Sequence, residues 1–370
     1  MKKQHFLLAI FFYVSASLYL AVTTPISPHE AKIFYTSEDL LSTLMHWGYT
    51  FLGGFLGGFL GGFFGLRFFF VLSGFLAVSL FYEMSKRYFD KREDAYVATI
   101  LFMFLPGILT ATTLVNVAIL VLPLVLLFVL MYERKSFWIL PFIMLALFFI
   151  HDASIIFFVA LLLYGMVHKD KKLAIASSAF LIAFVYLAKG IEIGGGPSGH
   201  FVEIFGLYAS VFSPLLFLYF FYAMYRILLR EKKTLLWYIS FTALAFSLLL
   251  SLRQRVSITD FAPYVMISIV LMLDIYNKSV RVRLPEFQKR YKRAFVVVMV
   301  FLGLSASLII LHKVTYILSS NSDKHFAKQI YEPYYLAKSL KEEAVPCYEG
   351  AQGRRRYQLR YYDILPCGNY

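Results

Sequence analysis

Long apolar runs recur along almost the whole chain, and this feature limits the fold more than any other. Hydrophobic residues make up 60% of the 370 residues, charged residues make up only 16%, and the mean hydropathy is +0.68. Many of the runs approach the length of about 20 residues that a helix needs to cross a bilayer. This pattern predicts an all-α polytopic membrane protein. It excludes a soluble enzyme, a secreted disulfide scaffold, a disordered chain and a DNA-binding domain as descriptions of the whole chain.

The apolar runs predict about eleven transmembrane helices. Their approximate ranges are 6–22, 66–83, 95–110, 114–132, 137–150, 155–167, 173–188, 211–229, 235–250, 261–277 and 294–312. Several ranges, such as 137–150 and 155–167, are short for a straight crossing. We expect these helices to extend into flanking polar residues or to pair as a tight hairpin.

Basic residues sort to one side of this topology. If the N-terminus lies in the cytoplasm, the inside loops hold most of the 36 Lys and Arg residues, and a further group lies in the C-terminal tail. The outside connections hold only Lys32, Arg67, Lys189, Arg253 and Arg255. Because cytoplasmic loops of membrane proteins are rich in Lys and Arg, the net charge of +14 fits an inside N-terminus.

A glycine-rich segment at 51–65 reads FLGGFLGGFLGGFFG and has a period of four. The spacing places Gly53, Gly57 and Gly61 on one helix face, where small residues permit close contact between backbones. A bilayer crossing here would move every later loop to the opposite side. We therefore interpret the segment as a re-entrant or interfacial helix that follows the outer loop 23–50.

The two ends of the chain differ in character. The N-terminus has a basic start and an apolar stretch without a convincing cleavage site, which indicates an uncleaved signal anchor. The polar tail 313–370 follows the membrane domain 1–312 and is expected outside. It contains the only two cysteines, Cys347 and Cys367. A disulfide is expected between them on an oxidising face, with two unpaired thiols as the alternative.

Ionisable and polar side chains gather near the outer ends of the predicted helices. Such groups are costly there unless they are paired or functional. A carboxylate can accept a proton from a hydroxyl group, and Arg or Lys can hold a phosphate. The candidates include His29, Glu30, Arg67, Asn116, His151, Asp152, Lys189, Glu203, Arg253, Arg255 and Asp260. We expect them to line one cavity that opens outward.

Each of these motifs also has a plainer interpretation. Arg253 and Arg255 can anchor the chain to lipid headgroups instead of binding a substrate phosphate. His151 and Asp152 can form a hydrogen bond at a helix end, since adjacent residues seldom bind one metal ion unaided. The segment 190–200 has neither the preceding strand nor the following Lys of a phosphate-binding loop, and we interpret it as an outer loop.

Four segments, taken in order, carry a resemblance to a known family. They are His29-Glu30-Ala31 in the first outer loop and the segments 66–107, 112–134 and 252–265. Together they resemble the integral-membrane glycosyltransferases of the GT-C class. Within that class they are similar to the protein-mannosyltransferase, aminoarabinose-transferase and RgtA/B/C/D-like group. The likeness extends over roughly residues 1–275.

This resemblance implies a sugar donor linked to polyprenyl phosphate and transfer to a lipid, glycan or protein acceptor on the extracytoplasmic side of the bacterial inner membrane. His29 and Asn116 stand where the family usually has acids, which leaves Glu30 as the candidate base. By the same resemblance, the binding candidates are Arg67, Arg253 and Arg255 for the donor phosphate and Asn116, His151 or Asp152 for the sugar or acceptor. A divalent metal ion stays open as a cofactor, and no nucleic-acid partner is expected.

Other functions stay open at this stage. A transporter or lipid flippase would favour charges near the bilayer midplane and broken helices that repeat in the two halves, but the prolines at 106, 123, 141, 214 and 263 show no such repeat. A non-catalytic membrane assembly subunit, or a family member without activity, is the other alternative. For the assembly subunit, Glu30 would be dispensable.

Overall fold

The computed structural model describes residues 3–56, 62–187, 189–191, 194, 196, 199–319, 324–345, 347–350 and 352–367. The chain divides into two compact units. The first unit comprises Met1–Tyr13, Ser73–Leu109 and Val117–Ala306, and the second comprises Val14–Leu72, Thr110–Asn116 and Ser307–Tyr370. The tail belongs to the same compact unit as the first outer loop. The division into a membrane domain 1–312 and a tail 313–370 stays a prediction.

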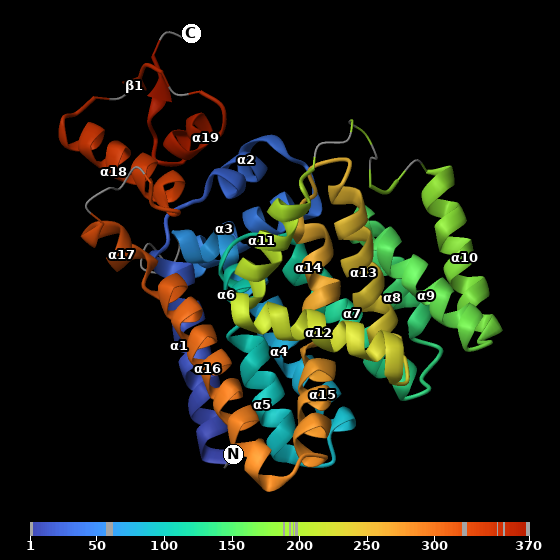
Figure 1. Cartoon of the computed structure of the whole chain (residues 1–370). Coiled ribbons are helices and arrows are strands. Elements are labelled where there is room, and N and C mark those ends of the chain that lie inside the picture. Colours follow the sequence, from blue (N-terminus) through green and yellow to red (C-terminus); the bar gives the residue numbers. More distant parts are fainter. Residues whose placement is uncertain are drawn as a thin grey trace. The chain divides into compact units, whose positions relative to one another are not determined.

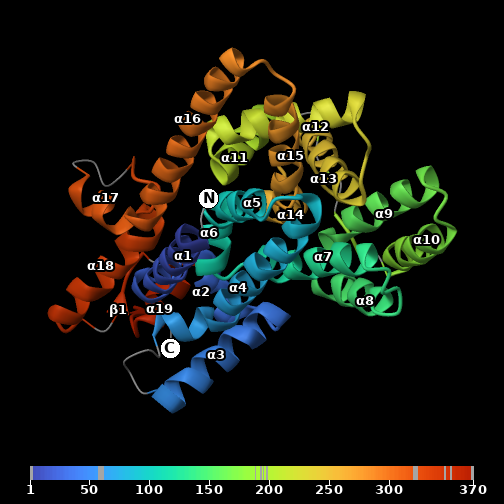
Figure 2. The same ribbon diagram turned by 90° about the horizontal axis from the view of Figure 1, so that it is seen from below.

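The first unit is a helical bundle (Figure 1). Its complete helices are α5 (Arg92–Met103), α7 (Val117–Glu133), α8 (Leu140–Ile150), α9 (Ile155–Val167), α10 (Lys171–Tyr186), α11 (Phe201–Phe212), α12 (Pro214–Arg230), α13 (Leu235–Ser251), α14 (Ile258–Met266) and α15 (Ile269–Arg281), with the short 3-10 helix η2 (Asp152–Ser154). Helix α9 packs against α10 and α13, and α14 packs against α13 and α7. In both Figure 1 and Figure 2, α8, α9 and α10 lie side by side.

Four further helices contribute residues to both units: α1 (Lys3–Thr23), α4 (Phe63–Tyr88), α6 (Pro106–Thr113) and α16 (Pro285–Ile310). Among the described residues, α1, α4 and α16 are long and apolar enough to cross a membrane. The pairs α5 with α6, α11 with α12 and α14 with α15 bend by 60°, 107° and 43°, so counting each pair as one span gives up to 6 candidate spans. The shorter apolar helices are α7, α8, η2 with α9, and α13.

Each predicted span overlaps one of these helices or bent pairs. The number of crossings and the side on which each loop lies stay predictions, because several of the helices are shorter than the roughly 20 residues of a straight crossing. Large apolar side chains such as Phe142, Phe149, Ile175 and Ile182 are exposed on α8 and α10. A membrane protein exposes such side chains to lipid, since the bilayer and not water surrounds them.

The second unit begins with the outer loop, which is largely helical. It contains α2 (Pro28–Thr36) and α3 (Leu40–Leu56), and α3 packs closely on α4. A Cβ atom on Gly48 would lie 2.3 Å from the Gly65 carbonyl oxygen, so this approach requires glycine at position 48. The helix predicted over 51–65 is divided, because α3 ends at Leu56, α4 starts at Phe63, and residues 57–61 lie outside the described residues.

The tail folds as a small subdomain of the second unit. It contains α17 (His312–Leu318), α18 (Lys328–Glu342), β1 (Cys347–Tyr348), α19 (Arg354–Tyr361) and β2 (Leu365–Pro366). The two short strands pair in parallel, a disulfide joins Cys347 to Cys367, and Ala337, Leu340, Leu359 and Ile364 form a small core. The tail also packs on α2 through α19, and the Gln358 amide donates a hydrogen bond to the Ile26 carbonyl at 2.9 Å.

Candidate functional site

Helix α2 begins at the predicted catalytic motif, His29-Glu30, and the local sequence explains why it begins there. Ser27 is the N-cap residue and accepts a hydrogen bond from the Glu30 backbone, while the Glu30 carboxylate accepts one from the Ser27 backbone at 2.8 Å. Pro28 occupies the first turn, where its missing N–H costs nothing. This capping box turns the Glu30 side chain back toward the start of the helix and into the protein.

Glu30 forms a fully buried ion pair with Arg67 of α4. Both side chains have an exposed fraction of 0%, and Arg67 binds the two carboxylate oxygens at 2.8 and 2.7 Å. The remaining guanidinium hydrogens donate to the carbonyls of Ala21, Thr24 and Pro25 at 2.7 to 3.2 Å. The pair therefore holds the chain that connects α1 to α2 against the first turns of α4.

The hydrogen bonds around Glu30 leave its carboxylate little capacity to accept a proton from a substrate. In addition to Arg67 and the Ser27 backbone, the Val115 N–H donates to Glu30 Oε1 at 3.0 Å, so each carboxylate oxygen accepts two hydrogen bonds. Burial alone would raise the pKa of this carboxyl, but the Arg67 charge and these hydrogen bonds lower it. An anion of this kind is a weak proton acceptor and is closed to substrate. The geometry favours a structural role for Glu30 over the general-base role expected from sequence.

The other candidates of the second unit lie close by in the chain. His29 is exposed as a whole residue, but part of its imidazole is shielded from solvent. This desolvation, and to a smaller extent the Arg354 charge, lowers the pKa of the imidazole. Asn116 is half-buried and directly follows Val115, whose N–H binds Glu30. Arg67, by contrast, lies in the internal ion pair described above. Its guanidinium is already occupied and is not open to a donor phosphate.

In the first unit, His151 and Asp260 form the pair that best fits acid–base chemistry. His151 follows α8, Asp260 lies in the first turn of α14, and His151 Nε2 lies 3.3 Å from Asp260 Oδ1. Their side chains are 18% and 28% exposed. The buried Nε2 atom makes no hydrogen bond among the described residues, since its contact with Asp260 lacks hydrogen-bond geometry. A part-exposed imidazole whose Nε2 atom faces a carboxylate is suited to general-base catalysis through its other ring nitrogen.

Helix α14 sets the position of this pair. One turn after Asp260, the Tyr264 hydroxyl donates to Ser154 Oγ at 3.1 Å, and both of these side chains are buried. Asp260 and Tyr264 are four residues apart and lie on the same helix face. The face of α14 that carries them therefore packs on the segment 151–154 and holds Asp260 beside His151.

Further charged residues of the first unit pair near the same loops. Lys189 lies 3.5 Å from Asp152, and Arg255 lies 3.0 Å from Glu203, which also contacts His200 at 2.9 Å. The Gln254 side chain accepts a hydrogen bond from the Gly194 backbone at 2.7 Å. Arg253 and Arg255 are exposed. These contacts connect three of the loops that the charge pattern predicts to lie outside, at 150–154, 187–203 and 251–260.

The predicted inside loops are connected in the same way. Hydrogen bonds join Tyr88 to Glu133 and Tyr132 to Asp170, each at 2.8 Å. Ion pairs join Arg281 to Asp94 at 3.4 Å and Lys278 to Glu231 at 4.0 Å. These contacts therefore form two sets, one among the loops predicted outside and one among the loops predicted inside. Which set faces the cytoplasm stays a prediction from the positive-inside rule.

The candidates fall into separate groups. Glu30, Arg67, His29 and Asn116 belong to the second unit, whereas His151, Asp152, Arg253 and Arg255 belong to the first. The single cavity expected for all of them stays a prediction. Over the described part of the chain, no group of three or more His, Cys, Asp or Glu side chains could hold a metal ion.

The helical membrane architecture corresponds to a GT-C-like fold. The chain is similar to the crystal structure of ArnT from Cupriavidus metallidurans in the apo state, with a TM-score of 0.50 and 14% sequence identity. The similarity covers 96% of this chain and 74% of that chain. The sequence matches no known family model, and no curated protein matches it. At this level of identity the likeness concerns the fold alone.

Proposed function

We propose that this protein is a membrane glycosyltransferase. It transfers a sugar from a polyprenyl-phosphate-linked donor to a lipid, glycan or protein acceptor on the extracytoplasmic side of the bacterial inner membrane. The observation that carries the proposal is the GT-C-like fold over 96% of the chain, combined with a part-exposed His151–Asp260 pair beside cationic loops. The charge distribution assigns these loops to the outer side.

His151 is the proposed general base, and Asp260 is its orienting carboxylate. The acceptor hydroxyl oxygen bonds to the anomeric carbon of the sugar as the bond from that carbon to the phosphate oxygen breaks. The electron pair leaves with the polyprenyl phosphate, and the hydroxyl proton passes to the other ring nitrogen of His151, Nδ1, since Nε2 is buried and faces Asp260. Asp260 stabilises the imidazolium that forms, because its carboxylate lies 3.3 Å away.

Cations of the same loop set are the proposed ligands of the donor phosphate. Arg253 and Arg255 are exposed and separated by one residue, and a planar guanidinium can bind two phosphate oxygens at once. Lys189, paired with Asp152 at 3.5 Å, is a further candidate. In this assignment Arg67 is not a phosphate ligand, because five hydrogen bonds already engage its guanidinium.

The test is a transfer assay with purified full-length protein and a polyprenyl-phosphate sugar. We expect His151→Gln and Asp260→Asn each to lower transfer by about 100-fold or more, the usual effect of disabling general-base catalysis. Asp94→Asn is the matched control, because it removes a carboxylate that pairs with Arg281 in the other loop set of the same unit.

Two results would contradict this proposal. Unchanged transfer in both His151→Gln and Asp260→Asn would remove the pair from the reaction. No transfer by wild-type protein with any polyprenyl-phosphate sugar, together with movement of the intact lipid between leaflets, would favour the flippase alternative. The second readout uses the same vesicles, with the lipid-linked sugar labelled on one leaflet.

A further inference from the structure

A groove lined by α8 and α10 begins at the end of α8 opposite to the end that His151 follows. Its volume is about 210 Å³, and its apolar wall includes Leu140, Met144, Leu173 and Ala176. Its polar lining residues are Tyr132, Asp170 and Lys172. The groove starts beside the first turn of α8, whereas His151 follows the last turn of the same helix.

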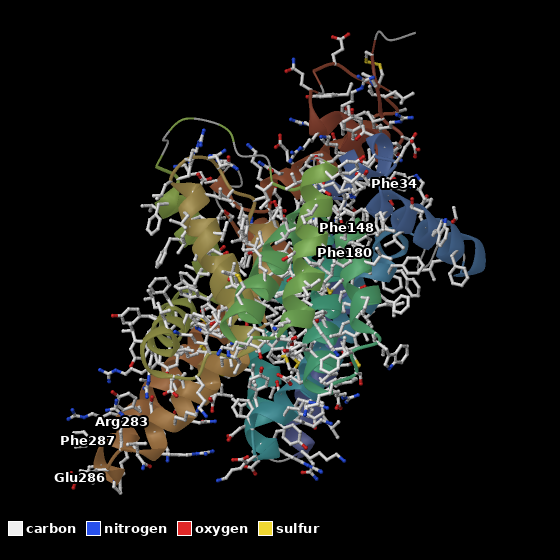
Figure 3. All side chains as sticks on the ribbon, turned by 90° about the vertical axis from the view of Figure 1, so that its right-hand side faces the viewer. Phe34, Phe148, Phe180, Arg283, Glu286 and Phe287 are labelled. Atoms are coloured by element: carbon white, nitrogen blue, oxygen red, sulfur yellow. A yellow bond between two sulfur atoms is a disulfide. The ribbon has the colours of Figure 1, made fainter. Side chains whose placement is uncertain are left out.

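Aromatic packing fills the space farther along the two helices. Phe148 of α8 and Phe180 of α10 lie together in Figure 3, with ring centroids 5.8 Å apart, and Phe184 contacts Phe148 at 4.5 Å. On the outer faces of the helices, Phe142 and Ile175 are exposed. The groove is therefore an opening in a surface that is otherwise apolar, and its size and lining suit an alkyl chain.

The loops beside this groove are strongly cationic. A hydrogen bond joins Tyr132, in the last turn of α7, to Asp170, the N-cap residue of α10. The exposed cations in the two loops are Arg134, Lys135, Lys169, Lys171 and Lys172. The two acids in the same loops are already engaged, since Glu133 accepts a hydrogen bond from Tyr88 and Asp170 accepts bonds from Tyr132 and the Leu173 backbone.

Local stability does not account for these cations. Lys135 and Lys169 have φ values of 59° and 58°, a region that favours glycine or asparagine. Lys171 and Lys172 occupy the first turn of α10, where the positive end of the helix dipole disfavours a cation. Each of these positions would favour another residue on local grounds. The positive-inside rule explains cations in such loops in general, and an anion bound in the groove would in addition stabilise Lys172, which lines it.

We infer that this groove binds an anionic phospholipid, with one acyl chain along Met144, Leu173 and Ala176 and the headgroup phosphate beside Lys172. Basic pockets between transmembrane helices suit such headgroups, and the cytoplasmic leaflet, where these loops are predicted to lie, is rich in anionic lipid. The five cations favour a headgroup with two phosphates over one. The site is separate from the proposed catalytic pair and does not depend on it.

The experiment measures lipid binding to detergent-purified full-length protein by native mass spectrometry. The probes are cardiolipin, phosphatidylglycerol, phosphatidylcholine, a polyprenyl phosphate and inorganic phosphate. We expect cardiolipin to bind most tightly and phosphatidylcholine most weakly. The Lys171→Gln/Lys172→Gln variant should bind cardiolipin roughly 10- to 30-fold more weakly, since each cation near a membrane surface contributes about 1 kcal/mol.

Two further variants separate the groove from general surface charge. Ala176→Phe fills part of the groove with a larger apolar side chain but keeps every cation. It should also weaken cardiolipin binding. Lys289→Gln/Arg290→Gln removes two exposed cations from α16 and should leave binding unchanged. Equal losses in this control and in Lys171→Gln/Lys172→Gln would overturn the inference.

Competition identifies the source of the phosphate. Displacement of cardiolipin by millimolar inorganic phosphate would overturn the assignment in favour of an ion site, and tighter binding of polyprenyl phosphate than of cardiolipin would overturn it in favour of the donor lipid. Failure of the transferase assay would not affect these results, because no turnover is needed to count bound lipid.

Discussion

The pairs Glu30–Arg67 and His151–Asp260 both combine a carboxylate with a basic side chain, yet their surroundings are opposite. Glu30 and Arg67 are fully buried, and every donor and acceptor that they offer is used. His151 and Asp260 are part-exposed, lie 3.3 Å apart, and leave the His151 Nε2 atom without a hydrogen bond among the described residues.

This difference separates a structural ion pair from a candidate reaction centre. A saturated buried pair fixes the backbone segments that it joins, but it offers no free atom to a substrate. A part-exposed pair can be reached by a substrate, and an imidazole beside a carboxylate can accept a proton. The family resemblance in the sequence favoured Glu30 as the base. The solvent exposure of the two side chains favours His151 instead.

The largest expected effect comes from breaking the buried pair. Arg67→Met leaves the Glu30 carboxylate buried without its counter-charge, and we expect a loss of about 3 to 5 kcal/mol in unfolding free energy. Thermal unfolding of the purified protein in detergent measures this loss. Arg255→Met is the matched control, because it breaks an exposed pair with Glu203 and should cost less than about 1 kcal/mol. Equal melting temperatures for the two variants would place the Glu30–Arg67 pair among ordinary surface contacts.

The disulfide in the same unit is expected to have the next largest effect. The Cys347–Cys367 bond closes a loop with a sequence separation of 20, and removing it should cost about 3 kcal/mol in the stability of the tail. Limited proteolysis of the Cys347→Ser/Cys367→Ser variant, with and without reducing agent, measures the effect. The variant should lose the tail faster than the oxidised wild type, and reducing agent should act only on the wild type. An equal rate of cleavage would show that the core around Leu340 and Leu359 holds the tail alone.

The pH dependence of stability also distinguishes the two pairs, because the pKa of the buried Glu30 carboxyl is lowered. The Arg67 charge and the hydrogen bonds favour the Glu30 anion in the folded state, even though burial opposes it. The stabilisation is therefore complete above the unfolded pKa of roughly 4 and is lost as the pH falls through the lower folded pKa. We expect the melting temperature of the wild type to fall below about pH 4 by more than that of Glu30→Gln, which has no carboxyl to protonate. Parallel pH curves would contradict the assignment.

Sequence reasoning located the helices better than the partners of individual side chains. The apolar runs each overlap a helix or a bent pair, because burial in a bilayer dictates composition over many residues. Sequence reasoning did not pair Glu30 with Arg67, since two residues 37 positions apart meet only through the tertiary fold. One local signal was available: Ser27-Pro28-His29-Glu30 is a capping-box pattern, which predicts helix α2 and an inward-turned Glu30.

The His151–Asp260 pair shows the same limit more strongly. Both residues were candidates from sequence, but each was placed at a different helix end, and nothing local links them. Their contact depends on the packing of α14 against the segment 151–154, which the buried Tyr264–Ser154 hydrogen bond accompanies. The break between α14 and α15 was also hidden, because the two helices form one continuous apolar run in the sequence.

The smallest expected effect on stability, and the most selective effect on function, belongs to Arg255. Its side chain is 74% exposed and its Nε atom lies 3.0 Å from Glu203, so Arg255→Gln should change the unfolding free energy by less than about 1 kcal/mol. If Arg255 holds the donor phosphate, the same variant should raise the KM for the polyprenyl-phosphate sugar by roughly tenfold with little change in kcat, since a charge-assisted hydrogen bond contributes about 1.5 to 3 kcal/mol. Glu203→Gln frees the guanidinium from its partner and should leave this KM unchanged or lower it. A rise in KM for Glu203→Gln equal to that for Arg255→Gln would instead show that the ion pair stabilises the conformation of the loop 251–260 and that Arg255 does not bind the phosphate.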